Sequence, residues 1–154
     1  MVRAEQRLRD LGIELPQPPK PLGAYVEAMR TGKLLYLSGM LPVHAGVSRY
    51  VGRIGGVLNA ADGRDAARIA ALNGLAVIRH HLGSLDKVAR IVSLRAYVAT
   101  EGDFRDHAAV ADGASELLVK IFGQDKASVR MVLGVASLPL GSPVAIELTV
   151  EVED

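Results

Sequence analysis

The sequence predicts an α+β fold in which a mixed β-sheet carries two long helices on one face. Three observations support this prediction: strand-like apolar runs come in clusters, two segments with helical periodicity interrupt these clusters, and 49% of the residues are hydrophobic. A length of 154 residues is typical of one domain, so we expect residues 1–154 to form a single unit around one core.

Residues 1–22 are expected to form an N-terminal extension made of a short helix and a proline-rich connector. Apolar residues recur at helical spacing from Ala4 to Leu11, and Gly12 can end this helix. The segment 16–21 contains four prolines, whose fixed φ and missing N–H groups keep the chain extended.

A β-hairpin is expected to follow this extension. Residues 25–29 and 34–38 are rich in strand formers and flank the turn pair Thr31-Gly32. The glycine-rich region 39–59 predicts mostly loop, with one short strand over residues 49–54.

The first long helix is predicted over Asp65–Leu82. Asn59 and Asp62 precede it and can cap its N-terminus, and Gly83 should end it.

The remaining elements are a strand over Val88–Thr100, a helix over Asp106–Phe122, and two strands over Ser128–Ser137 and Val144–Val152. Prolines and glycine in the segment 139–143 predict the turn between the last two strands. Both long helices should cover the same face of the sheet.

The other face of the sheet is also apolar in places, notably along Val129–Val135. A two-layer fold would leave that surface exposed, so the sequence predicts self-association.

Charge and composition exclude several classes of function. The 18 Lys and Arg balance 17 Asp and Glu, and a net charge of +1 does not favour a nucleic-acid partner. The absence of cysteine excludes disulfides, thiolate nucleophiles and iron–sulfur clusters. No signal-peptide core and no apolar run of about 18 residues is present, so we expect a cytoplasmic location and no membrane contact.

Familiar catalytic motifs are also missing. The four histidines never stand four residues apart, so we expect no metal site. No serine lies in a G-x-S-x-G motif, and Gly52-Arg53-Ile54-Gly55-Gly56 lacks the arrangement of a phosphate-binding loop.

Arg130 is the most informative residue because it lies on an otherwise apolar strand. A guanidinium stays charged and is costly to bury unpaired, so Arg130 needs a carboxylate partner. Two hypotheses follow. Glu147 on the next strand could form an ion pair with Arg130, or Arg130 could bind an anionic substrate while Glu147 handles a proton or a water molecule.

Several motifs recur in one order along residues 23–151. They are Gly23-x-Tyr25-Val26, Leu37-Ser38-Gly39-x-Leu41-Pro42-Val43, Gly102-Asp103-Phe104, Arg130-x-x-Leu133-x-x-Ala136-x-Leu138-Pro139 and Val144-x-Ile146-Glu147. This set resembles the signature of the Rid family, the reactive intermediate deaminases once called L-PSP endoribonucleases. The extension over residues 11–21 is similar to that of a less-characterised subgroup.

This resemblance implies a chorismate-mutase-like α+β fold, assembled as a homotrimer with three clefts between subunits. It implies that Arg130 holds a substrate carboxylate and that Glu147 helps to position the water that attacks the imine carbon. Tyr25 and Ser38 would line the pocket, and no metal or organic cofactor would be needed.

Besides Ser128-Val129, which replace the Pro-Ala pair that commonly precedes the arginine, three residues depart from the family pattern. Asp112 stands where the archetype has a pocket asparagine, Val132 replaces a cysteine, and Met40 replaces a glutamine. Asp112 would either repel a substrate carboxylate or pair with Arg130.

The first functional hypothesis is therefore a deaminase that hydrolyses small 2-imino acids. The alternative, motivated by the three departures, is a non-catalytic trimer that binds a small carboxylate as a sensor or interaction module. A ribonuclease is favoured only by the older family name, because no basic surface with interleaved aromatics is evident.

Overall fold

The computed structural model describes residues 2–153. Its helices and strands, in chain order, are α1 (Ala4–Asp10), β1 (Ala28–Thr31), β2 (Leu34–Leu37), β3 (Val43–His44), β4 (Val47–Ser48), α2 (Ala60–Leu82), β5 (Val88–Ala99), α3 (His107–Phe122), β6 (Val129–Val135) and β7 (Val144–Val152).

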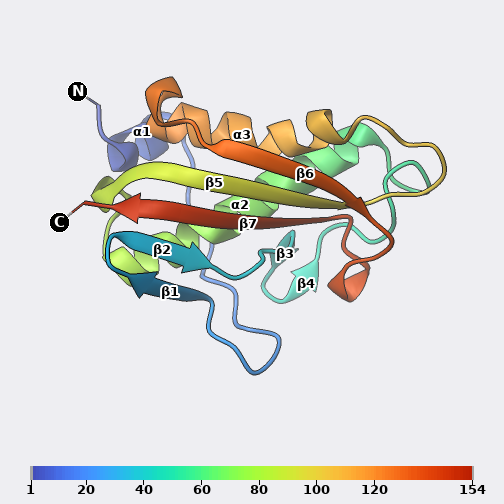
Figure 1. Cartoon of the computed structure of the whole chain (residues 1–154), viewed down its shortest axis with the longest axis horizontal. Helices are drawn as coiled ribbons and strands as arrows, with labels where there is room; N and C mark the ends of the chain where they lie inside the picture. The colour runs from blue at the N-terminus through green and yellow to red at the C-terminus, as the bar shows by residue number, and fades with distance from the viewer. Residues whose placement is uncertain (1, 154) are drawn as a thin grey trace.

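One mixed sheet with two helices behind it confirms the predicted α+β architecture (Figure 1). The five strands lie in the order β1-β2-β7-β5-β6, with β5 and β6 parallel and the other neighbours antiparallel. Helices α2 and α3 cover one face, and most of the core lies between them and the sheet. We call the uncovered face the open face. Strand β6 forms one edge of the sheet.

Helix α2 begins earlier than its periodicity predicts. A capping box joins Asn59 and Asp62, with each side chain accepting the other residue's backbone N–H, and this starts the helix at Ala60. Gly83 ends it in the left-handed conformation, as expected, at a φ of 85°. No helix within residues 2–153 combines the length and apolarity needed to cross a membrane.

The hairpin prediction is confirmed, but its first strand lies further along the chain. Thr31 pairs with Leu34, so the turn residues are Gly32 and Lys33, and Gly32 adopts a positive φ of 58°. The prediction of a strand over residues 49–54 is wrong.

The region 39–59 instead contains the short hairpin of β3 and β4, which turns at Ala45 and Gly46. Within residues 49–54, only Ile54 makes isolated β-bridges. The residue types of this segment did not show whether its backbone groups would find partners in a neighbouring strand.

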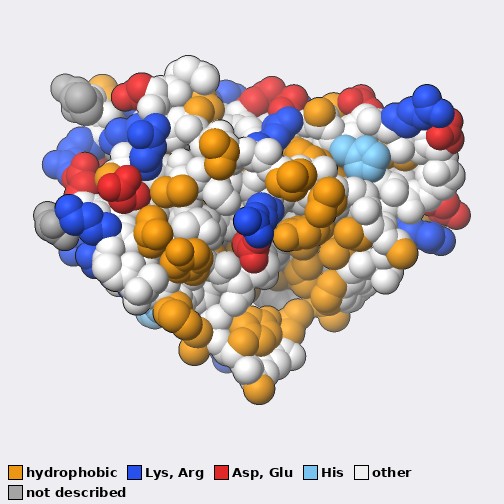
Figure 2. Space-filling model, in the orientation of Figure 1, with side chains coloured by type: hydrophobic (Ala, Val, Ile, Leu, Met, Phe, Trp, Pro, Cys, Tyr) orange, Lys and Arg blue, Asp and Glu red, His pale blue; other side chains and the backbone are white. Residues whose placement is uncertain are grey.

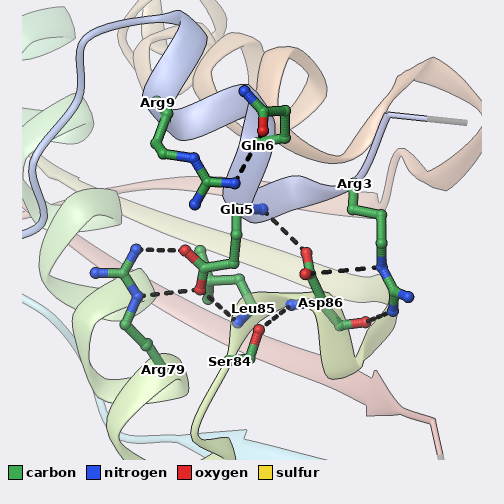
Figure 3. Close-up of polar contacts among 8 residues, drawn as sticks. All are labelled: Arg3, Glu5, Gln6, Arg9, Arg79, Ser84, Leu85 and Asp86. Carbon is green, nitrogen blue, oxygen red and sulfur yellow. Dashed lines mark hydrogen bonds and ion pairs between the residues drawn. The ribbon is translucent and has the colours of Figure 1, made fainter.

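Helix α1 packs against the rest of the fold, because Ala4 and Leu8 belong to the hydrophobic core. Figure 3 shows how its polar groups are held: Glu5 accepts hydrogen bonds from Arg79 at 3.1 and 2.6 Å and from the Leu85 N–H at 2.9 Å. Asp86 accepts the Glu5 N–H at 3.0 Å. These contacts fix the point from which the proline-rich segment starts.

Burial acts to raise the pKa of Glu5. The hydrogen bonds from Arg79 and Leu85 and the nearby positive charges outweigh burial, and they lower the pKa below its ordinary value. Glu5 is therefore ionised around neutral pH.

The open face carries exposed apolar side chains, as the sequence predicts. Val129, Met131 and Leu133 of β6 are 73%, 56% and 47% exposed. Figure 2 shows this side of the molecule, where hydrophobic side chains gather around a hollow.

Candidate functional site

A cleft of about 1160 Å³ opens beside the sheet, on its open face. Its walls come from the proline-rich segment 16–22, the segment 38–46, β7, and the turn after β6. The polar side chains that line it are Gln17, Lys20, Tyr25, Glu27, Ser38, His44, Asn73, Tyr97 and Glu147. We call this the Glu147 cleft.

Glu147 reaches the cleft because of its register on β7. It lies opposite Arg95 of β5, and their side chains form an ion pair with 3.8 Å between Arg95 Nη1 and Glu147 Oε1. The Glu147 side chain is 38% exposed, so a water molecule or a substrate can reach it.

Tyr25 and Ser38 line the same cleft and hold its rim together. The Tyr25 hydroxyl accepts the Leu22 N–H at 2.9 Å, and the Ser38 hydroxyl donates to the Val26 carbonyl at 2.7 Å. The Tyr25 proton and the Ser38 lone pairs are not used in these bonds, so a ligand could bind them.

The inner wall of the cleft is fixed by Asn73 of α2. Its side-chain amide donates to the Leu41 and Val43 carbonyls, both at 2.9 Å, and the residue is 2% exposed. A buried amide with two backbone partners holds the loop before β3 in one position.

Glu27 lies at the rim, with His81 Nε2 at 3.3 Å from its carboxylate. A hydrogen bond from its own backbone N–H lowers the pKa of Glu27 by more than burial raises it, and the contact with His81 lowers it further. Glu27 is therefore an ionised carboxylate at the edge of the cleft.

A second cluster, formed by Arg130, Asp112 and Ser115, lies where β6 meets α3. Arg130 Nη1 donates to Asp112 Oδ1 at 2.7 Å and to Ser115 Oγ at 3.2 Å. A smaller pocket of about 190 Å³ adjoins it, lined by Arg130 and Ser115 with neighbouring residues of β5, α3 and segment 126–128. We call Arg130, Asp112 and Ser115 the Arg130 cluster.

Val132 follows Arg130 on the same side of β6 and packs against the core. It is half-buried and has no polar atom to offer a ligand.

The hypothesis that Glu147 pairs with Arg130 across neighbouring strands is wrong. Strand β5 lies between β6 and β7, and Arg130 is in register with Leu94 whereas Glu147 is in register with Arg95. Consecutive residues of a strand point to opposite faces, so Arg130 faces the helices and Glu147 faces the open side. In the structure the partner of Arg130 is Asp112.

The six site residues expected from the sequence thus fall into two groups. Tyr25, Ser38 and Glu147 line one cleft, and Arg130 and Asp112 form the other cluster, with Val132 beside it. The chain thus supplies two candidate half-sites, and its own sheet separates them.

Three residues of these half-sites were not predicted. Arg95 and Tyr97 of β5 share the open face of the sheet with Glu147 and Ala145 of β7, and alternation along the predicted strand could have found them. Ser115 stands one helical turn after Asp112, a spacing that places both side chains on one helix face.

Within residues 2–153, no group of three or more His, Asp or Glu side chains is arranged to hold a metal ion. The side chains that the two candidate half-sites present include a guanidinium, carboxylates and hydroxyls.

Comparison with known proteins decides the family. Residues 5–152 match the family described as "YjgF/chorismate_mutase-like, putative endoribonuclease". The chain belongs to this family. It is the Rid family that the motifs indicate, and the match includes the proline-rich segment and all of α1 except Ala4.

Two Rid relatives match over nearly their whole lengths. Protein TCP17 of Trypanosoma cruzi is 35% identical over 153 residues, which are 99% of this chain and 96% of TCP17. A 2-iminobutanoate/2-iminopropanoate deaminase of Dermatophagoides farinae is 30% identical over 142 residues, covering 92% of this chain and 95% of that protein.

Solved structures agree with the fold. The crystal structure of a protein from Shewanella oneidensis, titled a "putative endoribonuclease", superimposes with a TM-score of 0.94 at 31% identity. The match covers 98% of this chain and 100% of that one. The chorismate-mutase-like fold expected from the motifs is confirmed.

Proposed function

We propose that this Rid protein is a cytoplasmic enamine/imine deaminase that hydrolyses small 2-imino acids to 2-keto acids and ammonia. The observation that carries the proposal is the pair of half-sites. One chain holds an anion-binding arginine at the sheet edge and a carboxylate in a cleft on the opposite face, and a second copy could join them.

The proposed assembly is a homotrimer with the reaction at clefts between subunits. It is supported by the exposed apolar side chains of β6, which would be buried if a second copy covered this edge. A relative named as a deaminase, at 30% identity over 92% of the chain, supports the activity.

In the proposed reaction Arg130 binds the substrate carboxylate through N–H groups that Asp112 and Ser115 do not use. Glu147 of another copy accepts a proton from the water that attacks the imine carbon. Glu147 returns this proton to the substrate nitrogen, which gives a carbinolamine. The hydroxyl proton of the carbinolamine then passes to the same nitrogen, the carbon–nitrogen bond breaks, and ammonia and a 2-keto acid leave. Tyr25 and Ser38 line the substrate's side of the cleft, and the reaction needs neither a metal nor an organic cofactor.

The test generates 2-iminopropanoate in situ and follows its loss. Wild-type protein should accelerate the loss, and both Arg130→Ala and Glu147→Gln should return the rate close to that of buffer. A wild-type rate equal to buffer, or an Arg130→Ala variant as fast as wild type, would disprove the deaminase proposal.

A non-catalytic carboxylate-binding trimer is the second candidate, and the contact between Asp112 and Arg130 favours it. Asp112 already occupies part of the guanidinium and would weaken the hold on a second carboxylate. Thermal-shift measurements separate the two candidates, because a stabilising 2-keto acid without any turnover supports binding alone.

A further inference from the structure

The Arg130 cluster presents two opposite charges side by side at a solvent-accessible place. Arg130 and Asp112 touch at 2.7 Å, and their side chains are 26% and 42% exposed. Asp112 uses one oxygen, Oδ1, for Arg130, and neither this contact nor any other contact within residues 2–153 uses its second oxygen. Both a donor fork and an acceptor oxygen are therefore available to a ligand.

A protonated 2-imino acid carries the complementary pair of charges on adjacent carbons. Its carboxylate is on one carbon and its iminium nitrogen is on the next, so both groups can bind side chains that are themselves in contact. A 2-keto acid has the same carboxylate but only a carbonyl oxygen in place of the nitrogen.

We propose that Asp112 accepts a hydrogen bond from the protonated nitrogen of the substrate while Arg130 holds its carboxylate. This inference rests on the proposed function and deepens it. The Arg130 cluster selects zwitterionic ligands, in which a carboxylate neighbours a positively charged nitrogen, over ligands that carry a carboxylate alone.

The carboxylate at position 112 has a chemical purpose in this scheme. An iminium carbon is a better electrophile than that of a neutral imine, and a nearby negative charge favours the protonated form. The iminium and water together give a 2-keto acid and an ammonium ion, so no further reactant is required. Asparagine could accept the same hydrogen bond but could not offset the charge.

The selection can be measured without any turnover. L-Alanine and pyruvate have three carbons each and share a carboxylate, but only alanine has a protonated nitrogen. Isothermal titration calorimetry of wild-type protein and Asp112→Asn with both ligands gives the ratio of their affinities. Asp112→Asn should lower the alanine-to-pyruvate affinity ratio by about tenfold or more, the loss expected for one charge-assisted hydrogen bond.

Ser115→Ala is the matched control, because it also removes a contact with Arg130 but changes no charge. It should weaken both ligands alike and leave the ratio unchanged. Asp112→Asn should also lower kcat/KM for 2-iminopropanoate, while pyruvate binds as well as before or better.

The outcomes separate this inference from the deaminase proposal. An alanine preference that Asp112→Asn abolishes, in a protein without turnover, supports the inference and rejects the deaminase. Turnover with an unchanged ratio in Asp112→Asn, or no alanine binding by wild-type protein, overturns the inference.

Discussion

At the scale of single residues, function depends on which face of the sheet each side chain occupies. Arg130 and Glu147 could be selected from the sequence because a charged side chain on an apolar strand is costly to bury without a partner or a ligand. Their separation could not be predicted, because it depends on β5 lying between β6 and β7 and on a register that joins distant segments.

The shape of the Arg130 side chain should matter as much as its charge. Arg130→Lys keeps the charge but lacks the planar fork, so it should lose a charge-assisted contact and about ten- to a hundredfold in kcat/KM for 2-iminopropanoate. Steady-state kinetics would measure this loss.

Arg95→Lys is the comparison for that change. Arg95 lies 3.8 Å from Glu147 and acts on it through charge, which lysine can also supply. A loss in Arg95→Lys as large as that in Arg130→Lys would contradict the role given to the guanidinium fork.

At the scale of elements, strong local signals predicted α2, β5, α3 and β7 well, because capping residues and long apolar runs act over short distances. The hairpin of β3 and β4 was missed, because its strands are two residues each and its position depends on Asn73 holding the preceding loop. The packing of α1 depends on contacts with residues 79–86, far away in the sequence.

Glu5 should stabilise the fold in a pH-dependent way. Its pKa is lowered in the folded protein, so its contribution is present above its ordinary pKa of 4.5 and disappears as the pH falls through the folded value. Glu5→Gln should cost about 1–2 kcal/mol at pH 7, since Arg79 is partly exposed, and less at low pH.

Thermal unfolding at several pH values would measure this contribution. Glu14→Gln makes the same change at an exposed position of the same segment and should have little effect. Equal losses from Glu5→Gln at pH 7 and below its folded pKa would contradict the argument.

The crossing of α2 and α3 depends on Gly113. A Cβ at this position would lie 2.0 Å from the Arg64 carbonyl oxygen, so the helices would have to move apart. Gly113→Ala should therefore destabilise the protein by about 1–3 kcal/mol or more.

Gly63→Ala provides a graded comparison in chemical denaturation. Its Cβ would meet the ends of the Ile54 and Val110 side chains at 3.0 Å, and these can shift more easily than backbone. An equal or larger loss in Gly63→Ala would show that the backbone contact does not limit the helix crossing.

At the scale of the whole molecule, the main question is why the open face carries exposed apolar side chains that the chain itself does not cover. Apolar residues on β6 could be predicted to be exposed from the two-layer pattern alone. The surface that would cover these residues could not be predicted, because complementarity between copies leaves no periodic signal in the sequence.

Met131→Asp should break the proposed trimer. Met131 is 56% exposed on β6, so a carboxylate there should leave the fold intact but oppose burial against a second copy. Light scattering should report the mass of one chain and circular dichroism an unchanged fold.

Leu11→Asp is the control, since Leu11 is 45% exposed at the end of α1, away from the sheet. It should leave the trimer mass unchanged. A trimeric Met131→Asp protein would contradict assembly through this face.

The most direct test of the account mixes two inactive variants. Arg130→Ala and Glu147→Gln chains are unfolded together in equal amounts and refolded. In a cyclic trimer each site lies between two copies, so about a quarter of the sites receive an intact Arg130 from one copy and an intact Glu147 from the next. The mixture should therefore regain about a quarter of wild-type deaminase activity. Each variant refolded alone should stay inactive. If the mixture also stays inactive while wild-type protein treated in the same way recovers, the two half-sites do not act together across copies.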